Sequence, residues 1–160
     1  MFIRFFVILP QSGDVVAEAL VRDPRAWVPG IAVGAEERGE RLLAEVGFGP
    51  RRRRLGSLVE IEIGEPVRLG PTTVLPISWS PTSSTGLLPV LEGDLEVSPL
   101  GADRTQLAMS ARYRPPLGGV GRVVDRALLH RVAESTVKDF LDRIGQTLER
   151  SISEEVSTAQ

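Results

Sequence analysis

The feature that most constrains this fold is a long stretch near the C-terminus, from Val120 to Ile152. It contains no proline, and its only glycines are Gly121 near the start and Gly145 near the end. With a rise of about 1.5 Å per residue, a helix over this stretch is roughly 45 Å long. We therefore expect one long terminal helix around which the rest of the chain is arranged.

The second half of this stretch has the pattern of a helix with one buried face. Apolar residues recur there at intervals of three or four, while charged residues such as Lys138 and Asp142 occupy the opposite side. The apolar row consists of Ala133, Val137, Phe140, Leu141, Ile144 and Leu148. We expect this row to cover the apolar face of a sheet.

The first half of the stretch does not keep that phase. At roughly 100° per residue, its apolar residues point more than about 90° away from the later row. These out-of-phase residues are Val120, Val124, Ala127, Leu128 and Val132. The face that continues the later row carries Arg122, Arg126 and His130 instead, spaced by four.

Three arrangements would accommodate the change of phase: a kink near His130, cover by the preceding loop, or contact with a second subunit. A kink usually needs proline, glycine or an inserted side chain, and neither proline nor glycine occurs between Arg122 and Ile144. We favour a continuous helix whose first turns are covered by loops or by a symmetric partner, which leaves a homodimer open. Arg126 and His130 would then face the mouth of a cavity.

The composition is that of one ordinary globular domain. The chain has 160 residues, of which 42% are apolar and 25% charged, and a domain of this size buries roughly 70% of its unfolded surface. We expect residues 1–152 to form the domain and residues 153–160 to be a polar, frayed tail. The net charge of −2 gives no overall field that would attract nucleic acid or an anionic membrane.

The chain contains no cysteine, which excludes disulfides, thiolate nucleophiles and cysteine-based zinc sites. This is compatible with the cytoplasm, where we expect the protein to be. The apolar run from Phe5 to Leu9 is too short for a signal peptide and lacks a small-residue cleavage site before Asp14. We interpret it as part of a first strand that Pro10 ends. No run approaches the ~18 apolar residues of a membrane span.

Two short helices and then a set of strands are expected after Pro10. Ser12 is a suitable N-cap for an amphipathic helix that stops at Asp23, and one further turn can follow it. Beyond residue 40 the apolar period changes to two, which indicates antiparallel strands. The predicted strands cover 41–48, 58–63, 72–80, 88–97 and 105–114. Pro76 inside the third of them indicates an edge position or a bulge.

Local motifs and the order of elements together resemble a known superfamily. The motifs are Leu75–Trp79, Pro89–Val97, Tyr113–Gly118 and Arg122–Glu134. With this element order they resemble the START/Bet v1-like helix-grip superfamily (SRPBCC), in particular its polyketide cyclase/dehydrase-like bacterial members. The resemblance implies an α+β fold in which a curved antiparallel sheet of six or seven strands wraps around the C-terminal helix. Residues 50–56 are too rich in arginine and glycine to place one of those strands.

The resemblance also implies a cavity between sheet and helix that binds apolar or amphipathic small molecules. Members of the superfamily include lipid carriers, cyclases, hydrolases and receptors. We expect no cofactor and no metal, and assign no catalytic residue. The candidate residues around the cavity are Trp79, Leu91, Leu95, Met109, Tyr113, Arg126 and His130.

His130, the only histidine, has two interpretations. It can serve as a general acid or base, or anchor a ligand carbonyl, with Arg122 and Arg126 adding affinity for anions. Alternatively it makes one hydrogen bond at the edge of the core while the arginines reach solvent over their aliphatic stems. With Glu134 four residues on it could ligate a metal, but two ligands do not make a site.

The other candidate motifs have structural interpretations. Trp79, Tyr113 and Trp27 suit a cavity wall, yet core packing explains them equally well. The arginine run 51–54 favours a solvated hairpin or edge strand over a nucleic-acid site. The glycine-rich segment 118–121 lacks the lysine of a phosphate-binding loop. The strand carboxylates lie on the polar side of their strands, which we expect to face solvent. There Arg112 and Arg114 can pair with them across strands. These carboxylates are Glu60, Glu62, Glu92, Asp94 and Glu96.

Three functions are compatible with these observations. The leading hypothesis is a carrier, sensor or sequestering protein that binds a lipid- or polyketide-like small molecule. The alternative is a polyketide cyclase/dehydratase-type enzyme in which His130, Tyr113 and an arginine polarise or deprotonate the substrate. Such an enzyme can work mainly by holding its substrate in a reactive shape, so the lack of a dense acid/base cluster does not exclude it. The third is an interaction protein whose cavity is closed.

Overall fold

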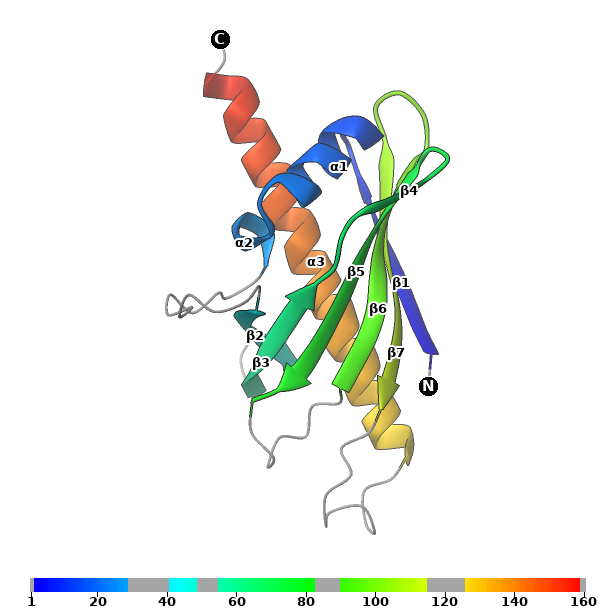
Figure 1. Ribbon diagram of the computed structural model, residues 1–160, viewed down its shortest axis with the longest axis vertical. Coiled ribbons are helices and arrows are strands. Elements are labelled where there is room, and N and C mark those ends of the chain that lie inside the picture. The colour runs from blue at the N-terminus through cyan, green and yellow to red at the C-terminus, as the bar shows by residue number, and fades with distance from the viewer. Residues whose placement is uncertain (1, 29–40, 49–54, 83–89, 115–125, 159–160) are drawn as a thin grey trace.

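The computed structural model describes residues 2–28, 41–48, 55–82, 90–114 and 126–158. The chain begins with one strand and two short helices, continues with six strands, and ends with the long helix (Figure 1). In order, the elements are β1 Phe2–Leu9, α1 Gly13–Arg22, α2 Pro24–Trp27, β2 Arg41–Phe48, β3 Leu55–Ile63, β4 Val67–Leu69, β5 Thr72–Pro81, β6 Val90–Pro99, β7 Thr105–Arg114 and α3 Arg126–Thr158.

The seven strands of the described residues form one antiparallel sheet. The strand order is β1-β7-β6-β5-β3-β2, and the three-residue strand β4 pairs with β5 beside the end of β3. Helix α3 runs diagonally across one face of this sheet, and α1 and α2 pack near its C-terminal half (Figure 1). The predicted α+β helix-grip architecture, with a sheet around a long C-terminal helix and two short helices after the first strand, is therefore confirmed.

The core lies between the sheet and α3, as the two periodicities predict. The whole apolar row of α3, from Ala133 to Leu148, is buried. The inward residues of β6 and β7 pair directly: Leu91 lies opposite Tyr113, and Leu95 opposite Met109. Because side chains alternate along a strand, the residues between them face away from the helix.

Gly145 allows α3 to approach β1 closely. A Cβ atom at this position would lie 3.2 Å from Cγ2 of Val7 and 3.4 Å from Cδ2 of Leu9. A larger side chain would therefore crowd the side chains of Val7 and Leu9, which would have to shift. The glycine that interrupts the long helical sequence is thus placed where the sheet and helix touch.

For Pro76 the sequence predicted an edge position or a bulge, and the structure contradicts the first of these alternatives. Strand β5 is not an edge strand, because it lies between β6 and β3. The irregularity is in its neighbour: Ile63 pairs with Ile77 and Val67 with Val74, so the three residues 64–66 lie opposite only two. Pro76 falls in this break, where its carbonyl accepts a hydrogen bond from the Gly64 N–H at 2.9 Å. The missing N–H of the proline therefore interrupts no regular ladder at that point.

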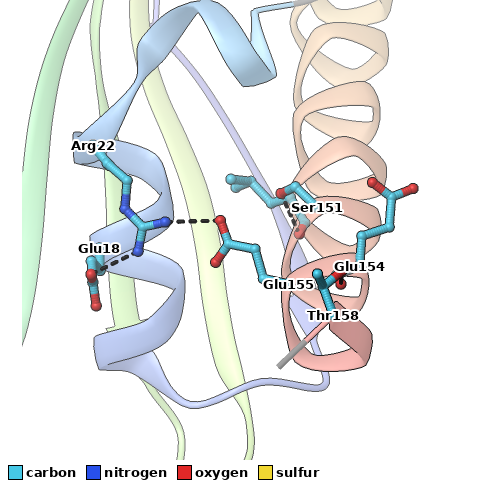
Figure 2. Close-up of polar contacts among 7 residues, drawn as sticks. Glu18, Arg22, Ser151, Glu154, Glu155 and Thr158 are labelled. Carbon is cyan, nitrogen blue, oxygen red and sulfur yellow. Dashed lines mark hydrogen bonds and ion pairs between the residues drawn. The ribbon is translucent and has the colours of Figure 1, made fainter. Parts of the chain in front are cut away.

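The predicted frayed tail is also corrected, since α3 continues through Ser153 to Thr158. Figure 2 shows Arg22 of α1 between Glu18, one turn earlier, and Glu155 of α3, at 2.7 and 2.8 Å. The hydrogen bond from Arg22 to Glu18, and then the charge of Glu155, raise the pKa of the guanidinium above its ordinary value. The exposed Arg22–Glu155 pair ties the last turn of α3 to α1.

The helix continues through His130 without interruption, as predicted. Val120, Arg122 and Val124 lie outside the described residues, as do the side chains of Arg126 and Leu128. Ala127, one member of the out-of-phase set, is exposed. The cover over the first turns of the helix therefore stays a prediction.

Candidate functional site

The candidate site is centred on a contact between the end of β7 and the start of α3. Tyr113 is the last inward residue of β7 and is 2% exposed. Its hydroxyl lies 3.0 Å from Nδ1 of His130, and the two rings stack with centroids 6.0 Å apart and planes inclined by 24°. A buried hydroxyl needs a hydrogen-bond partner, and the only histidine in the chain supplies it.

Glu134 holds the other side of the imidazole. Its Oε1 lies 3.2 Å from Nε2 of His130, which is the contact expected of residues four apart on a helix. The side chains of His130 and Glu134 are 37% and 44% exposed, so this end of the chain of contacts reaches solvent. The result is a continuous series from a surface carboxylate through imidazole to a buried phenol.

Below this polar end, the predicted cavity residues form two cross-strand rows on the inward face of the sheet. Trp79, Leu91 and Tyr113 are aligned across β5, β6 and β7, and Leu75, Leu95 and Met109 make the next row. All six side chains are buried. Five of these six residues, all except Leu75, are candidates from the sequence, and His130 contacts Tyr113 at the end of the first row. Six of the seven candidates are therefore brought together, and the side chain of the seventh, Arg126, lies outside the described residues.

Sheet and helix touch directly at Trp79. Its ring meets the ring of Phe140 on α3 edge-on, with centroids 5.1 Å apart and planes inclined by 70°. His130 and Phe140 are ten residues apart, which is about 15 Å along a helix. The Tyr113–His130 contact and the Trp79–Phe140 contact therefore mark the two ends of one segment of the sheet–helix interface.

A pocket that the sequence did not predict lies at the junction of α1 and α2. It has a volume of about 320 Å³ and opens between that junction and the break after β3. Its lining combines apolar side chains with a polar rim: Val21, Asp23, Pro24, Arg25, Ile63, Gly64, Glu65 and Leu75. Leu75 also belongs to the second inward row, so the pocket reaches a residue of the core.

Trp27, one of the cavity-wall candidates, has a structural role. Its indole Nε1–H donates to the carbonyl oxygen of Leu20 at 2.7 Å, and the ring is buried. Asp23 ends α1 and accepts a hydrogen bond from the backbone N–H of Arg25 at 3.0 Å, which caps α2. Together these contacts fix α2 on α1.

The strand carboxylates face solvent, as predicted. Glu92 pairs with Arg114 across the strands, and Glu96 pairs with Arg4 at 2.9 Å and accepts a hydrogen bond from Ser110 at 2.7 Å. These carboxylates lie on the face opposite the candidate site. Residues 51–54 and 118–121 lie outside the described residues.

The described part of the chain contains no group of three histidine, aspartate or glutamate side chains arranged to hold a metal ion. None of its helices is both long and apolar enough to cross a membrane.

No family model matches this sequence, and no curated protein matches it either. Its structure nevertheless resembles solved structures over almost the whole chain. A conserved protein from Geobacillus kaustophilus matches with a TM-score of 0.60 and 14% identity, over 96% of each chain. A START superfamily protein from Mycobacterium smegmatis matches with a TM-score of 0.58 and 14% identity, over 96% of this chain and 97% of its own.

The Zhui aromatase/cyclase from Streptomyces sp. R1128 matches with a TM-score of 0.50 and 13% identity, over 98% of this chain and 93% of its own. At such identities the likeness concerns the fold alone. The chain therefore has the helix-grip fold of START/Bet v1-like proteins, as the sequence resemblance predicted.

Proposed function

We propose that this protein binds an apolar or amphipathic small molecule, lipid- or polyketide-like, between the sheet and α3. The observation that carries the proposal is the polarity of the inward face. On the sheet, two rows of buried and otherwise apolar side chains end at the contact of Tyr113 with His130. On the described part of α3, the buried Thr136 donates its hydroxyl hydrogen to the carbonyl oxygen of Val132. An interface that is apolar over its length and polar at one end suits a molecule with an apolar body and one polar head.

The dimensions are consistent with such a ligand. The proposed site extends from His130 toward Phe140, about 15 Å along α3, which is the length of a fused ring system or a short acyl chain. Arg126 lies four residues before His130 and so on the same face of the helix. We propose that it adds a cation at the polar end.

The alternative, a polyketide cyclase/dehydratase-type enzyme acting in the same site, is favoured by one specific observation. Glu134, His130 and Tyr113 form a connected series of hydrogen-bonding groups of the kind that can move a proton. A solved aromatase/cyclase also shares the fold. The test is the exchange with solvent of the hydrogens between the two carbonyl groups of a bound 1,3-diketone. If this exchange is faster than in buffer and Tyr113→Phe abolishes the acceleration, the enzyme is favoured over the carrier.

The binding proposal is tested with 2-naphthol and long-chain alcohols as competitors of a fluorescent apolar probe. Wild type is expected to bind the probe saturably and release it to the competitors. Leu91→Trp, which adds volume to the middle of the first row, is expected to weaken binding, whereas Lys138→Ala on the exposed side of α3 leaves it unchanged. Absence of saturable binding by wild type would contradict the proposal.

Two expectations about context remain proposals. We propose that the ligand is bound in the cytoplasm. A second copy of the chain is one of the two covers proposed for the first turns of the long helix. Sedimentation velocity at several concentrations distinguishes it from cover by loops, since only the dimer gives a species of twice the mass.

A further inference from the structure

We propose that Glu134 determines which kind of polar head group the site accepts, and that this group is a hydrogen-bond donor such as an alcohol, a phenol or an N–H. The inference rests on the proposed function, because it concerns the polar end of the same site. The imidazole of His130 has two polar contacts, a hydrogen bond with Tyr113 and a close approach to the carboxylate of Glu134. Nδ1 lies 3.0 Å from the Tyr113 hydroxyl, and Nε2 lies 3.2 Å from Oε1 of Glu134.

In a neutral imidazole these two contacts favour one arrangement of the protons. An ionised carboxylate can only accept a hydrogen bond, so the nitrogen that faces Glu134 carries the hydrogen. A neutral imidazole has one N–H, which leaves Nδ1 with a lone pair directed at Tyr113. The hydroxyl of Tyr113 is then the donor. The opposite tautomer would set the Nε2 lone pair against the carboxylate oxygen, which is unfavourable.

This proton order restricts which further hydrogen-bond partners the Tyr113 hydroxyl can have. A phenol has one hydrogen, and here it is directed at Nδ1 of His130. Any further partner of the phenol oxygen, whether from the protein or from a ligand, must therefore donate. A ketone, ether or carboxylate would place lone pairs against lone pairs, whereas a hydroxyl or N–H fits. This head group differs from the ligand carbonyl, which is one of the partners that the sequence left open for His130.

Glu134 is accordingly a positioning residue that need not touch the ligand. Glutamine at this position offers either an oxygen or an NH2 group to Nε2, so it stabilises both tautomers. Asp142 provides a matched control. It accepts from Lys138 at 2.7 Å in another i,i+4 pair of α3, eight residues beyond Glu134.

The first test is the tautomer itself, which NMR of 15N-labelled protein reports without overlap because the chain has one histidine. At a pH where the spectrum shows neutral imidazole, wild type is expected to carry the proton on Nε2. Glu134→Gln and Glu134→Ala are expected to increase the fraction with the proton on Nδ1, and Asp142→Ala to leave it unchanged. A wild-type protein with the proton on Nδ1 would overturn the inference.

The second test compares 2-naphthol with 2-methoxynaphthalene, which differ in one hydrogen-bond donor. The ratio of their affinities in wild type, divided by the ratio in Tyr113→Phe, removes the difference in hydrophobicity between the probes. We expect this corrected ratio to favour 2-naphthol about two- to tenfold, the typical effect of one hydrogen bond. It should fall toward one in Glu134→Gln and stay at the wild-type value in Asp142→Ala.

The outcomes separate the inference from the proposed function. If both probes bind wild type with a corrected ratio of one, binding stands and the head-group inference is overturned. If neither probe binds wild type, the proposed function fails and the head-group preference fails with it. The tautomer of His130 would then still decide whether Glu134 orients the imidazole.

Discussion

Replacing Phe140 by alanine tests the contact on which the sheet–helix interface depends. Phe140 is 1% exposed, and its ring meets Trp79 edge-on at 5.1 Å. Truncation of a buried phenylalanine to alanine costs about 3–5 kcal/mol, through lost burial and the space left behind. About 0.5–1.5 kcal/mol of that is the aromatic pair itself. In a domain of this size the melting temperature should fall by about 6–20 °C.

Urea unfolding followed by tryptophan fluorescence measures this loss, because the only two tryptophans, Trp27 and Trp79, are both buried. Phe140→Leu keeps most of the volume and should cost less than half as much. Lys138→Ala, on the exposed side of the same helix, should stay within about 0.5 kcal/mol of wild type. A loss below about 1 kcal/mol for Phe140→Ala would refute a direct sheet–helix contact at Trp79.

Three further predictions concern the same framework. Gly145→Val should destabilise the protein by about 1–3 kcal/mol in urea unfolding, because a Cβ at this position already approaches Val7. Adding Val7→Ala should recover part of the loss. Purely additive effects of the two substitutions would contradict the close approach. Leu141→Asp buries a charge in the core and should cost at least about 3 kcal/mol or prevent folding, so a cost below about 1 kcal/mol would place this side chain outside the core. Arg22→Ala removes only exposed ion pairs, so thermal melts should show a small change that high salt abolishes; a large, salt-independent change would assign Arg22 a packing role.

The parts of the fold that could be predicted are those where burial imposes a period. Leu91 and Leu95 alternate with acidic residues because only one face of β6 meets the helix. The row from Ala133 to Leu148 repeats every three or four residues for the same reason. The core and the long helix could therefore be predicted from the residue pattern, and the resemblance supplied the way the sheet and helix are combined.

The features that were missed depend on neighbours distant in sequence. Strand β4 has three residues, too few to show a period, and forms because β5 offers it a partner after β3 ends. Pro76 is tolerated inside the sheet because the break is in the adjacent strand. The last helical turns, near Glu155, are tied to Arg22, 133 residues earlier.

The candidate site was predicted in part. Tyr113 and His130 were both named, but their hydrogen bond depends on how β7 and α3 meet, which no local pattern encodes. For Glu134 the sequence suggests a role only as a metal ligand. Its spacing of four from His130 was the signal that could have identified it as the residue orienting the imidazole.

The most direct test of ligand binding between the sheet and α3 uses the two tryptophans as reporters. Trp79 lies in the first inward row, whereas Trp27 is hydrogen-bonded to Leu20 where α2 packs on α1. In 15N-labelled protein titrated with 2-naphthol, the indole N–H signal of Trp79 is expected to shift saturably while that of Trp27 stays nearly constant. A saturable shift confined to Trp27, or no shift in either signal, would contradict binding between the sheet and α3.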